Sequence, residues 1–177
     1  MTRLPTKRPS YPCILERVAA YPGVVTISGW RNVRIVSWVA QAIGPAVEEV
    51  HRAMDRSQSF PQYSWVHLIR DKLPLPDARA RDGFVRMMRD RSSELACVAV
   101  VVGGTGFWAS AMRNAVIGLR VFAPGKFDLR LHGSIDEVVT WLPNAHQRKT
   151  QVELPATALR ELLMQAQALE PESRPSL

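Results

Sequence analysis

The motif most suggestive of chemistry is a glycine-rich segment past the middle of the chain. Gly103-Gly104-Thr105-Gly106 follows an apolar run and precedes a segment of helical character. Gly103, Gly106 and Ala109 match the G-x-x-G-x-x-G/A spacing of nucleotide-binding turns. In such turns glycine lets the backbone approach a pyrophosphate, and the helix N-terminus attracts the anion. A nucleotide site at Gly103, Gly104 and Gly106 is therefore one alternative function.

The position of this motif favours a purely structural turn. A dinucleotide-binding fold places the motif near its start, whereas only about 70 residues follow it here, too few for the rest of such a sheet at ordinary element lengths. No Tyr-x-x-x-Lys pair follows to carry out redox chemistry. We therefore expect a tight strand-to-helix turn and no cofactor.

Other residue types that could do chemistry lack the necessary spacing. The four histidines His51, His67, His132 and His146 do not pair with one another or with cysteine at metal-ligand spacing. No G-x-S-x-G nucleophile elbow is present. Cys97 lies in an apolar run and is expected to be a buried, inert thiol. The sequence thus predicts no catalytic residue and no metal site, and a protein that is not an enzyme.

Composition and charge narrow the class of protein further. The chain has 177 residues, of which 46% are hydrophobic and 22% charged, as expected for one globular domain with short appendages. The formal net charge is +7, but the basic residues are scattered among acids and match no nucleic-acid-binding motif. No apolar stretch is long enough to span a membrane. We therefore expect a cytoplasmic protein that binds neither nucleic acid nor membrane.

Hydrophobic periodicity predicts strands that alternate with helices. The expected strands are Val24–Trp30, Val33–Val39, Trp65–Ile69, Cys97–Val102 and Phe127–His132. Helices are expected from Gly44, over Ala78–Arg91, over Phe107–Phe122, over Ile135–Leu142 and from Pro155. This order predicts an α/β fold with a mostly parallel five-stranded sheet, an N-terminal β-hairpin, helices packed on the sheet and an extra C-terminal helix.

The same pattern divides the chain into five segments. We expect a basic, proline-rich leader over residues 1–17, an α/β domain over 18–143 and a polar linker over 144–154. An amphipathic helix over 155–169 and a tail over 170–177 follow. Pro143 is expected to end the preceding helix, since proline removes a backbone donor.

Two helices carry more apolar surface than one sheet contact requires. The helix Phe107–Phe122 is interrupted only by four polar residues, and the C-terminal helix carries a leucine stripe. A large apolar face seldom stays bare, so these helices either pack within the chain or contact another protein. The candidate interface residues are Trp108, Met112, Val116, Leu119, Leu159, Leu162 and Leu163, with Arg113 and Arg120 as a polar rim.

Three segments are typical of a known family in this order of elements: Ala99-Val100-Val101-Val102, Ala109 to Phe122, and the stretch from Leu129 to Leu142 with its Ser134-Ile135-Asp136-Glu137 cap. With them, the chain resembles the STAS-like domains, the fold of SpoIIAA-like anti-anti-sigma factors. It covers about two thirds of the chain and is closest to divergent bacterial members of unknown function. It implies a non-enzymatic regulatory or scaffold module that binds a protein partner or forms a homo-oligomer.

This chain departs from the regulated members of that family at one position. Those members carry a phosphorylatable Ser or Thr at the start of the helix after the third strand. The corresponding segment here reads Leu73-Pro74-Leu75-Pro76-Asp77 and has no hydroxyl group. The resemblance therefore implies the fold and the binding role without the phosphorylation switch.

Overall fold

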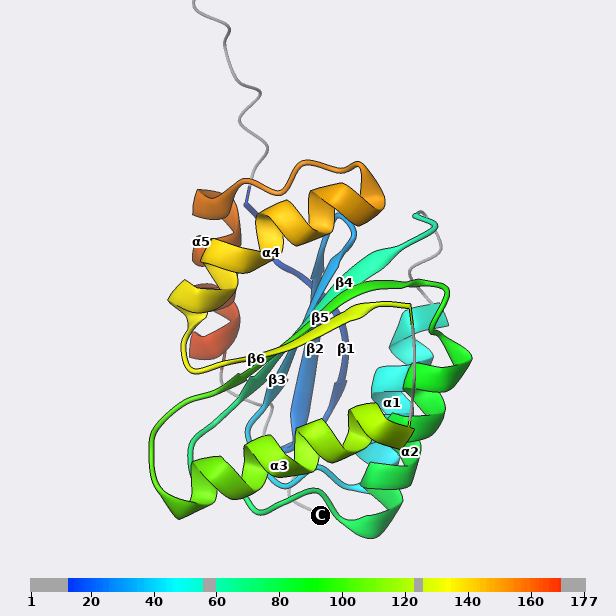
Figure 1. Ribbon diagram of the computed structural model, residues 1–177, viewed down its shortest axis with the longest axis vertical. Coiled ribbons are helices and arrows are strands. Elements are labelled where there is room, and N and C mark those ends of the chain that lie inside the picture. Colours follow the sequence, from blue (N-terminus) through cyan, green and yellow to red (C-terminus); the bar gives the residue numbers. More distant parts are fainter. Residues whose placement is uncertain (1–12, 56–59, 123–125, 170–177) are drawn as a thin grey trace, which may run out of the picture.

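The protein is built around one six-stranded sheet that is covered by helices on both faces (Figure 1). The computed structural model describes residues 13–55, 60–122 and 126–169. The strands follow chain order across the sheet: β1 (Glu16–Tyr21), β2 (Val25–Trp30), β3 (Val33–Trp38), β4 (Tyr63–Ile69), β5 (Leu95–Val102) and β6 (Asp128–His132). The first three strands pair antiparallel, and β3 to β6 pair parallel.

Each parallel connection passes through a helix on the same face. The helices are α1 (Gly44–Asp55), α2 (Ala78–Asp90), α3 (Phe107–Phe122), α4 (Ile135–Thr150) and α5 (Ala156–Ala168). Because the strands advance in one direction and such crossovers are right-handed, α1, α2 and α3 all lie on one face. Figure 1 shows α4 and α5 on the opposite face. This is the mixed α/β architecture that the STAS-like resemblance implied.

The sheet lies between two separate apolar cores. Every residue of β5 is buried, as the continuous apolar run predicted. Alternation along β4 directs Trp65 toward α1–α3 and Val66 toward α4 and α5. Two predicted caps are also present: Asp77 accepts from the Ala80 N–H, and Ser134 accepts from the Glu137 N–H.

Strand β1 was not predicted from the sequence. The leader was expected to extend to residue 17, but β1 begins at Glu16 and pairs with β2, so the sheet has six strands rather than five. Its register shifts between Arg17 and Ala19, and most of its residues are partly or fully exposed. An irregular edge strand carries little apolar alternation. Residues 1–12 of the leader and the tail over 170–177 lie outside the described residues.

The predicted linker over 144–154 was wrong in its first part. Helix α4 continues through Pro143 to Thr150. Beyond the proline it buries Ala145 and His146 completely against the sheet. This burial stabilises the helix beyond the point at which the missing proline donor was expected to end it.

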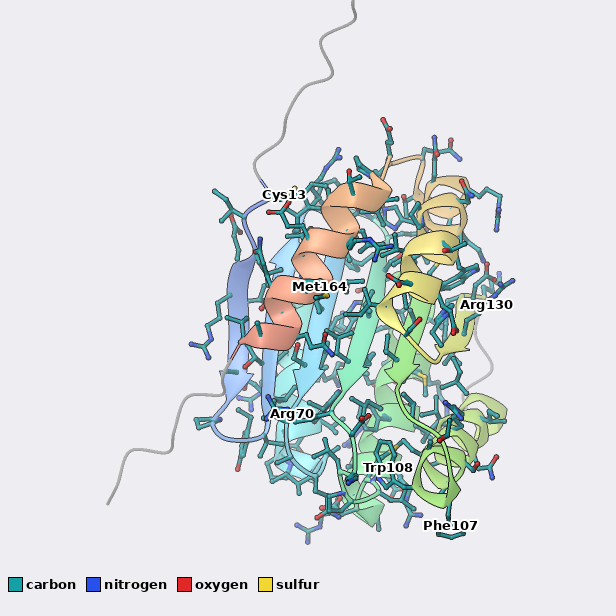
Figure 2. The ribbon with its side chains drawn as sticks, turned by 90° about the vertical axis from the view of Figure 1, so that its left-hand side faces the viewer. Cys13, Arg70, Phe107, Trp108, Arg130 and Met164 are labelled. Carbon is teal, nitrogen blue, oxygen red and sulfur yellow. The ribbon has the colours of Figure 1, made fainter. Side chains whose placement is uncertain are left out.

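Helix α5 packs on its own sheet. Leu159, Leu162 and Leu163 are fully buried against the α4 side of the sheet, and the Ser37 hydroxyl donates to the Ala166 carbonyl. Met164, on the outer surface, is 55% exposed (Figure 2). The leucine stripe therefore packs within the chain rather than against another protein. These leucines could contact another chain only if α5 left the sheet.

Because α5 packs on the sheet, substitutions at two adjacent residues should change the free energy of unfolding by very different amounts. Leu163→Ala should lower the free energy of unfolding by about 2–5 kcal/mol, because it opens a cavity in the core. The neighbouring exposed change Met164→Ala should alter it by less than about 0.5 kcal/mol. Urea unfolding of both variants measures the difference. Equal, small effects would show that α5 does not pack on the sheet in solution.

Candidate functional site

The candidate site lies between the sheet and helices α2 and α3. Trp38 at the end of β3 and Trp65 and His67 on β4 all point to this face, because strand residues two apart share a face. Phe84 of α2 meets the Trp38 ring edge-on, with the ring centroids 5.6 Å apart. The result is an aromatic cluster with a histidine at its centre.

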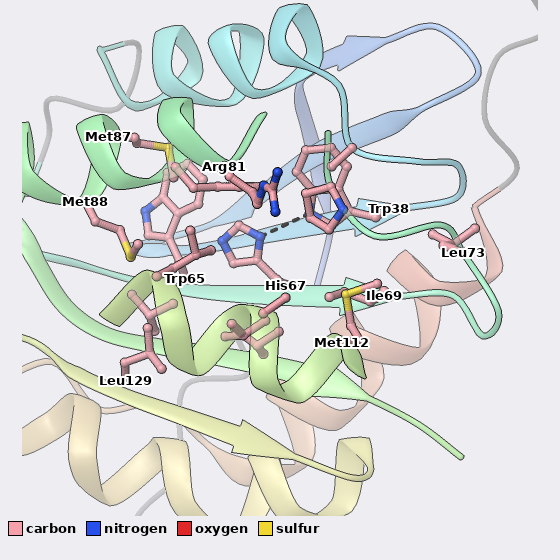
Figure 3. Close-up of a pocket in the computed structure, with 18 of the residues that line it drawn as sticks. Trp38, Trp65, His67, Ile69, Leu73, Arg81, Met87, Met88, Met112 and Leu129 are labelled. Carbon is pink, nitrogen blue, oxygen red and sulfur yellow. Dashed lines mark hydrogen bonds between the residues drawn. The ribbon is translucent and has the colours of Figure 1, made fainter. Parts of the chain in front are cut away.

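His67 is held neutral and in one tautomer. The Trp38 indole N–H donates to His67 Nδ1 over 3.1 Å (Figure 3). Burial lowers the pKa of His67 to about 4. Since Nδ1 accepts a hydrogen bond in a neutral ring, the proton lies on Nε2. No described residue accepts a hydrogen bond from that Nε2–H.

A cavity of about 80 Å³ adjoins this cluster. Its walls are almost wholly apolar. The wall formed by α2 and α3 comprises Arg81, Phe84, Met87, Met88, Met112, Ala115, Val116 and Leu119. Arg81 and Pro74 are exposed residues that line the cavity, so the cavity reaches the surface near the start of α2. Figure 3 shows the Arg81 side chain extending from α2 in the direction of Trp38.

Trp65 contributes a second donor without a partner. Its ring is 1% exposed, and among the described residues nothing accepts from its Nε1–H. Figure 3 shows this nitrogen on the side of Met87 and Met88. Two other buried atoms also lack partners, His132 Nε2 and Trp141 Nε1, whose rings lie 5.2 Å apart. Neither of those residues lines this cavity.

The opposite face of the sheet carries a fully bonded polar network. The Ser64 hydroxyl lies 2.7 Å from His146 Nδ1, and His146 Nε2 lies 3.1 Å from Asn32 Oδ1. The amide oxygen can only accept, so Nε2 carries the ring proton and Nδ1 accepts from Ser64. The Asn32 amide donates onward to the Gln62 carbonyl. Each member of this chain has its hydrogen bonds satisfied.

Burial makes this network structural. Ser64 and His146 are 0% exposed, and Asn32 is 2% exposed. Burial, followed by the charge of Arg31, lowers the pKa of His146 to about 4. Cys97 adjoins Ser64, and burial raises the pKa of its thiol to about 11, in keeping with the inert thiol expected from the sequence. A serine and a histidine at this distance could form a nucleophile and base, but no substrate reaches them here.

The glycine-rich turn is shaped by its neighbours. A Cβ on Gly103 would lie 3.0 Å from Asp71 Oδ1, and Gly104 and Gly106 have φ of 73° and 91°. The Arg113 guanidinium donates to the carbonyls of Val102 and Gly104. The Asp71 carboxylate therefore lies next to Gly103 and Gly104, two of the three glycines of the nucleotide alternative. The turn borders an open groove of about 500 Å³ at the carboxyl ends of the strands.

The residues predicted for an interface on α3 fall into two groups. Met112 and Val116 are buried in the core, whereas Trp108 and Leu119 are half-buried. The Trp108 indole donates to the Leu73 carbonyl over 2.5 Å, so this ring turns inward. The exposed apolar residues of the described part of α3 are Phe107 and Ile117, which were not among the predicted interface positions. The side chain of Arg120 lies outside the described residues.

Comparison with solved structures shows a likeness in fold. The chain is similar to an uncharacterised protein of the DUF3478 family from Shewanella loihica PV-4, whose structure is described as having a SpoIIAA-like fold. The TM-score is 0.49 at 14% sequence identity, over 67% of this chain and 92% of that one. The SpoIIAA-like fold is also the class that the sequence resemblance predicted. No protein-family model and no curated protein matches the chain.

None of the helices within 13–55, 60–122 and 126–169 has the length and apolarity needed to cross a bilayer. Over the same ranges, no three His, Cys, Asp or Glu side chains gather in a way that could hold a metal ion.

The two buried histidines predict how stability depends on pH. An unfolded histidine takes up a proton near pH 6.5, whereas His67 and His146 stay neutral down to about pH 4. Stability from these rings is therefore complete above pH 6.5 and falls as the pH drops toward 4, by roughly 3 kcal/mol per ring. Urea unfolding between pH 7.5 and 4.5 measures the loss, and NMR of the ring protons assigns it. Ring titration near pH 6.5 would contradict the burial of both histidines.

Proposed function

We propose that the protein is a non-enzymatic regulatory module that binds another protein through the outer face of α3. The observation that carries the proposal is the lack of charge on that face. Its exposed residues between 107 and 119 are Phe107, Ser110, Asn114 and Ile117. Phe107 is 90% exposed and points away from the body of the protein (Figure 2).

The neighbouring helix provides the contrast. The exposed surface of α2 carries Arg79, Arg81, Asp82, Arg86, Arg89 and Asp90. On α3, Arg113 is half-buried and its guanidinium bonds the glycine turn. Protein interfaces are depleted of charge and enriched in aromatic residues at their centres. The outer face of α3 has that composition, whereas α2 has the composition of ordinary solvated surface.

The charge of the chain indicates the kind of partner. The formal net charge of +7 opposes the approach of a second copy and favours a surface of opposite sign. We therefore infer a partner with an apolar centre bordered by acidic side chains. The SpoIIAA-like fold supports this role, since it fits regulatory protein-interaction modules, and it is typically non-enzymatic. The burial of Ser64 and His146 agrees with a role that requires no catalysis.

The test is quantitative capture from the native cell with matched variants. Phe107→Asp and Ile117→Asp each place a carboxylate on the outer face of α3, and should reduce recovery of the specific partner at least tenfold. Loss of apolar contact and repulsion by the acidic rim both act in this direction. Arg86→Asp places the same carboxylate on exposed α2 and is the control. It should reduce recovery by less than threefold.

Two results would contradict the proposal. The first is equal recovery of every partner by the wild type and both α3 variants. The second is a stable homodimer in light scattering that Ile117→Asp converts to a monomer, because α3 would then bind a second copy rather than an acidic partner. Circular dichroism and urea unfolding should show that all three variants remain folded, since the changed side chains are exposed.

A further inference from the structure

The apolar core on the α1–α3 side contains two hydrogen-bond donors with nothing to bond. Among the described residues, Trp65 Nε1–H is fully buried and has no acceptor. His67 Nε2–H has no acceptor either, but this atom is not fully enclosed, and its ring lines the cavity. Leaving a buried donor unpaired costs about 1–3 kcal/mol. The network around Ser64 satisfies the buried polar groups at the centre of the opposite face. Unlike the unpaired atoms of His132 and Trp141, the donors of Trp65 and His67 belong to residues that line a cavity, and this combination indicates a ligand with acceptor atoms.

The cavity beside these donors limits the size of the ligand. Its volume of about 80 Å³ is roughly half that of an engineered apolar cavity of about 150 Å³ that holds benzene. Both Trp65 and His67 line it, together with flexible methionines such as Met87, Met88 and Met112. Methionine adapts its shape to irregular apolar ligands. The enclosed space holds only the few apolar carbons of a short acid, whose charged end must lie at the surface, and it is too small for a long acyl tail.

The mouth of the cavity sets the charge of the ligand. Arg81 lines it there and has no carboxylate partner among the described residues. In the view of Figure 3 the Arg81 side chain extends in the direction of Trp38, whereas the Trp65 nitrogen lies on the side of Met87 and Met88. A guanidinium and an imidazole N–H together favour a carboxylate. The more distant indole N–H favours a second oxygen on the same molecule.

We propose that this cavity binds a small oxo-carboxylic acid of about five to seven carbons. Its carboxylate pairs with Arg81 and accepts from His67 Nε2–H, and its apolar carbons lie against Trp65 and the methionines. Its carbonyl oxygen accepts from Trp65 Nε1–H. The site is distinct from the outer face of α3 and does not depend on the proposed protein partner.

The experiment titrates the full chain with probes that differ by one group. Two probes are oxo-acids, 4-oxohexanoate and 5-oxohexanoate. The third probe, hexanoate, lacks their ketone oxygen. The fourth probe, 1-hexanol, also lacks the negative charge of the carboxylate. Calorimetry measures the affinity, and the fluorescence of Trp38 and Trp65 reports occupancy because both rings line the cavity. At least one oxo-acid should bind about fivefold more tightly than hexanoate, and hexanoate about tenfold more tightly than 1-hexanol.

Three variants and one control variant show which residues cause these differences in affinity. Arg81→Gln should abolish the preference for hexanoate over 1-hexanol, whereas Arg86→Gln on the exposed side of α2 should leave it unchanged. Trp65→Phe keeps the ring but removes the donor, so it should abolish the preference for the oxo-acid over hexanoate. Ala115→Leu narrows the cavity from α3 and should prevent binding of every probe.

The proposal fails on any of three outcomes. Absence of saturable binding by all probes at millimolar concentration rules out the site. Equal binding of hexanoate and 1-hexanol by the wild type rules out the carboxylate. Unchanged oxo-acid binding by the folded Ala115→Leu variant places the ligand elsewhere. Urea unfolding shows whether Trp65→Phe is folded, and Arg81→Gln, altered at an exposed side chain, provides an independent test.

Discussion

The rest of the structure depends on one constraint: a sheet covered on both faces must find partners for its polar groups. Strand β4 lies at the centre of that problem, since six of its seven residues are buried. Alternation sends Ser64 toward α4 and α5, and sends Trp65 and His67 toward α1–α3. Strand β4 therefore places polar side chains that need hydrogen-bond partners on both buried faces, and the two faces provide those partners differently.

On the α4 side, Ser64 finds its hydrogen-bond partners in a closed network. His146 bonds both Ser64 and Asn32, so that α4 is joined to β4 and to the turn before β3. This requirement explains why α4 continues beyond Pro143: the histidine that completes the network lies past the proline. On the α3 side Trp38 satisfies one nitrogen of His67, and the remaining donors adjoin a cavity. The Ser64 network is therefore closed within the chain, whereas the donors of Trp65 and His67 face the cavity that we propose as a binding site.

The sequence was sufficient for the fold class and most elements, and the reasons are local. The apolar run at Cys97 predicted buried β5, and the capping residues Asp77 and Ser134 marked the starts of α2 and α4. Strand β1 was missed because an exposed edge strand with an irregular register has no clear alternation. The continuation of α4 was missed because its cause is the tertiary burial of His146, which no local pattern records.

The site could not be predicted because its parts are far apart in the chain and individually ordinary. Trp38, Trp65 and His67 were each consistent with a buried strand, and Arg81 with a solvated helix face. Their meeting depends on the parallel register of β3 and β4 and on the packing of α2. The alternation of Trp65 and His67 on one strand face was a signal that could have indicated a polar site within the core.

The most direct measurement of the central claim compares two buried indoles by NMR. Trp65 and Trp141 both have an Nε1–H without a partner, but only Trp65 lines the cavity. Titration of the 15N-labelled protein with the tighter oxo-hexanoate should shift the Trp65 indole N–H downfield and slow its exchange with water. The Trp141 signal should not move. An unmoved Trp65 signal at saturating probe, or an equal shift of both indoles, would contradict the account.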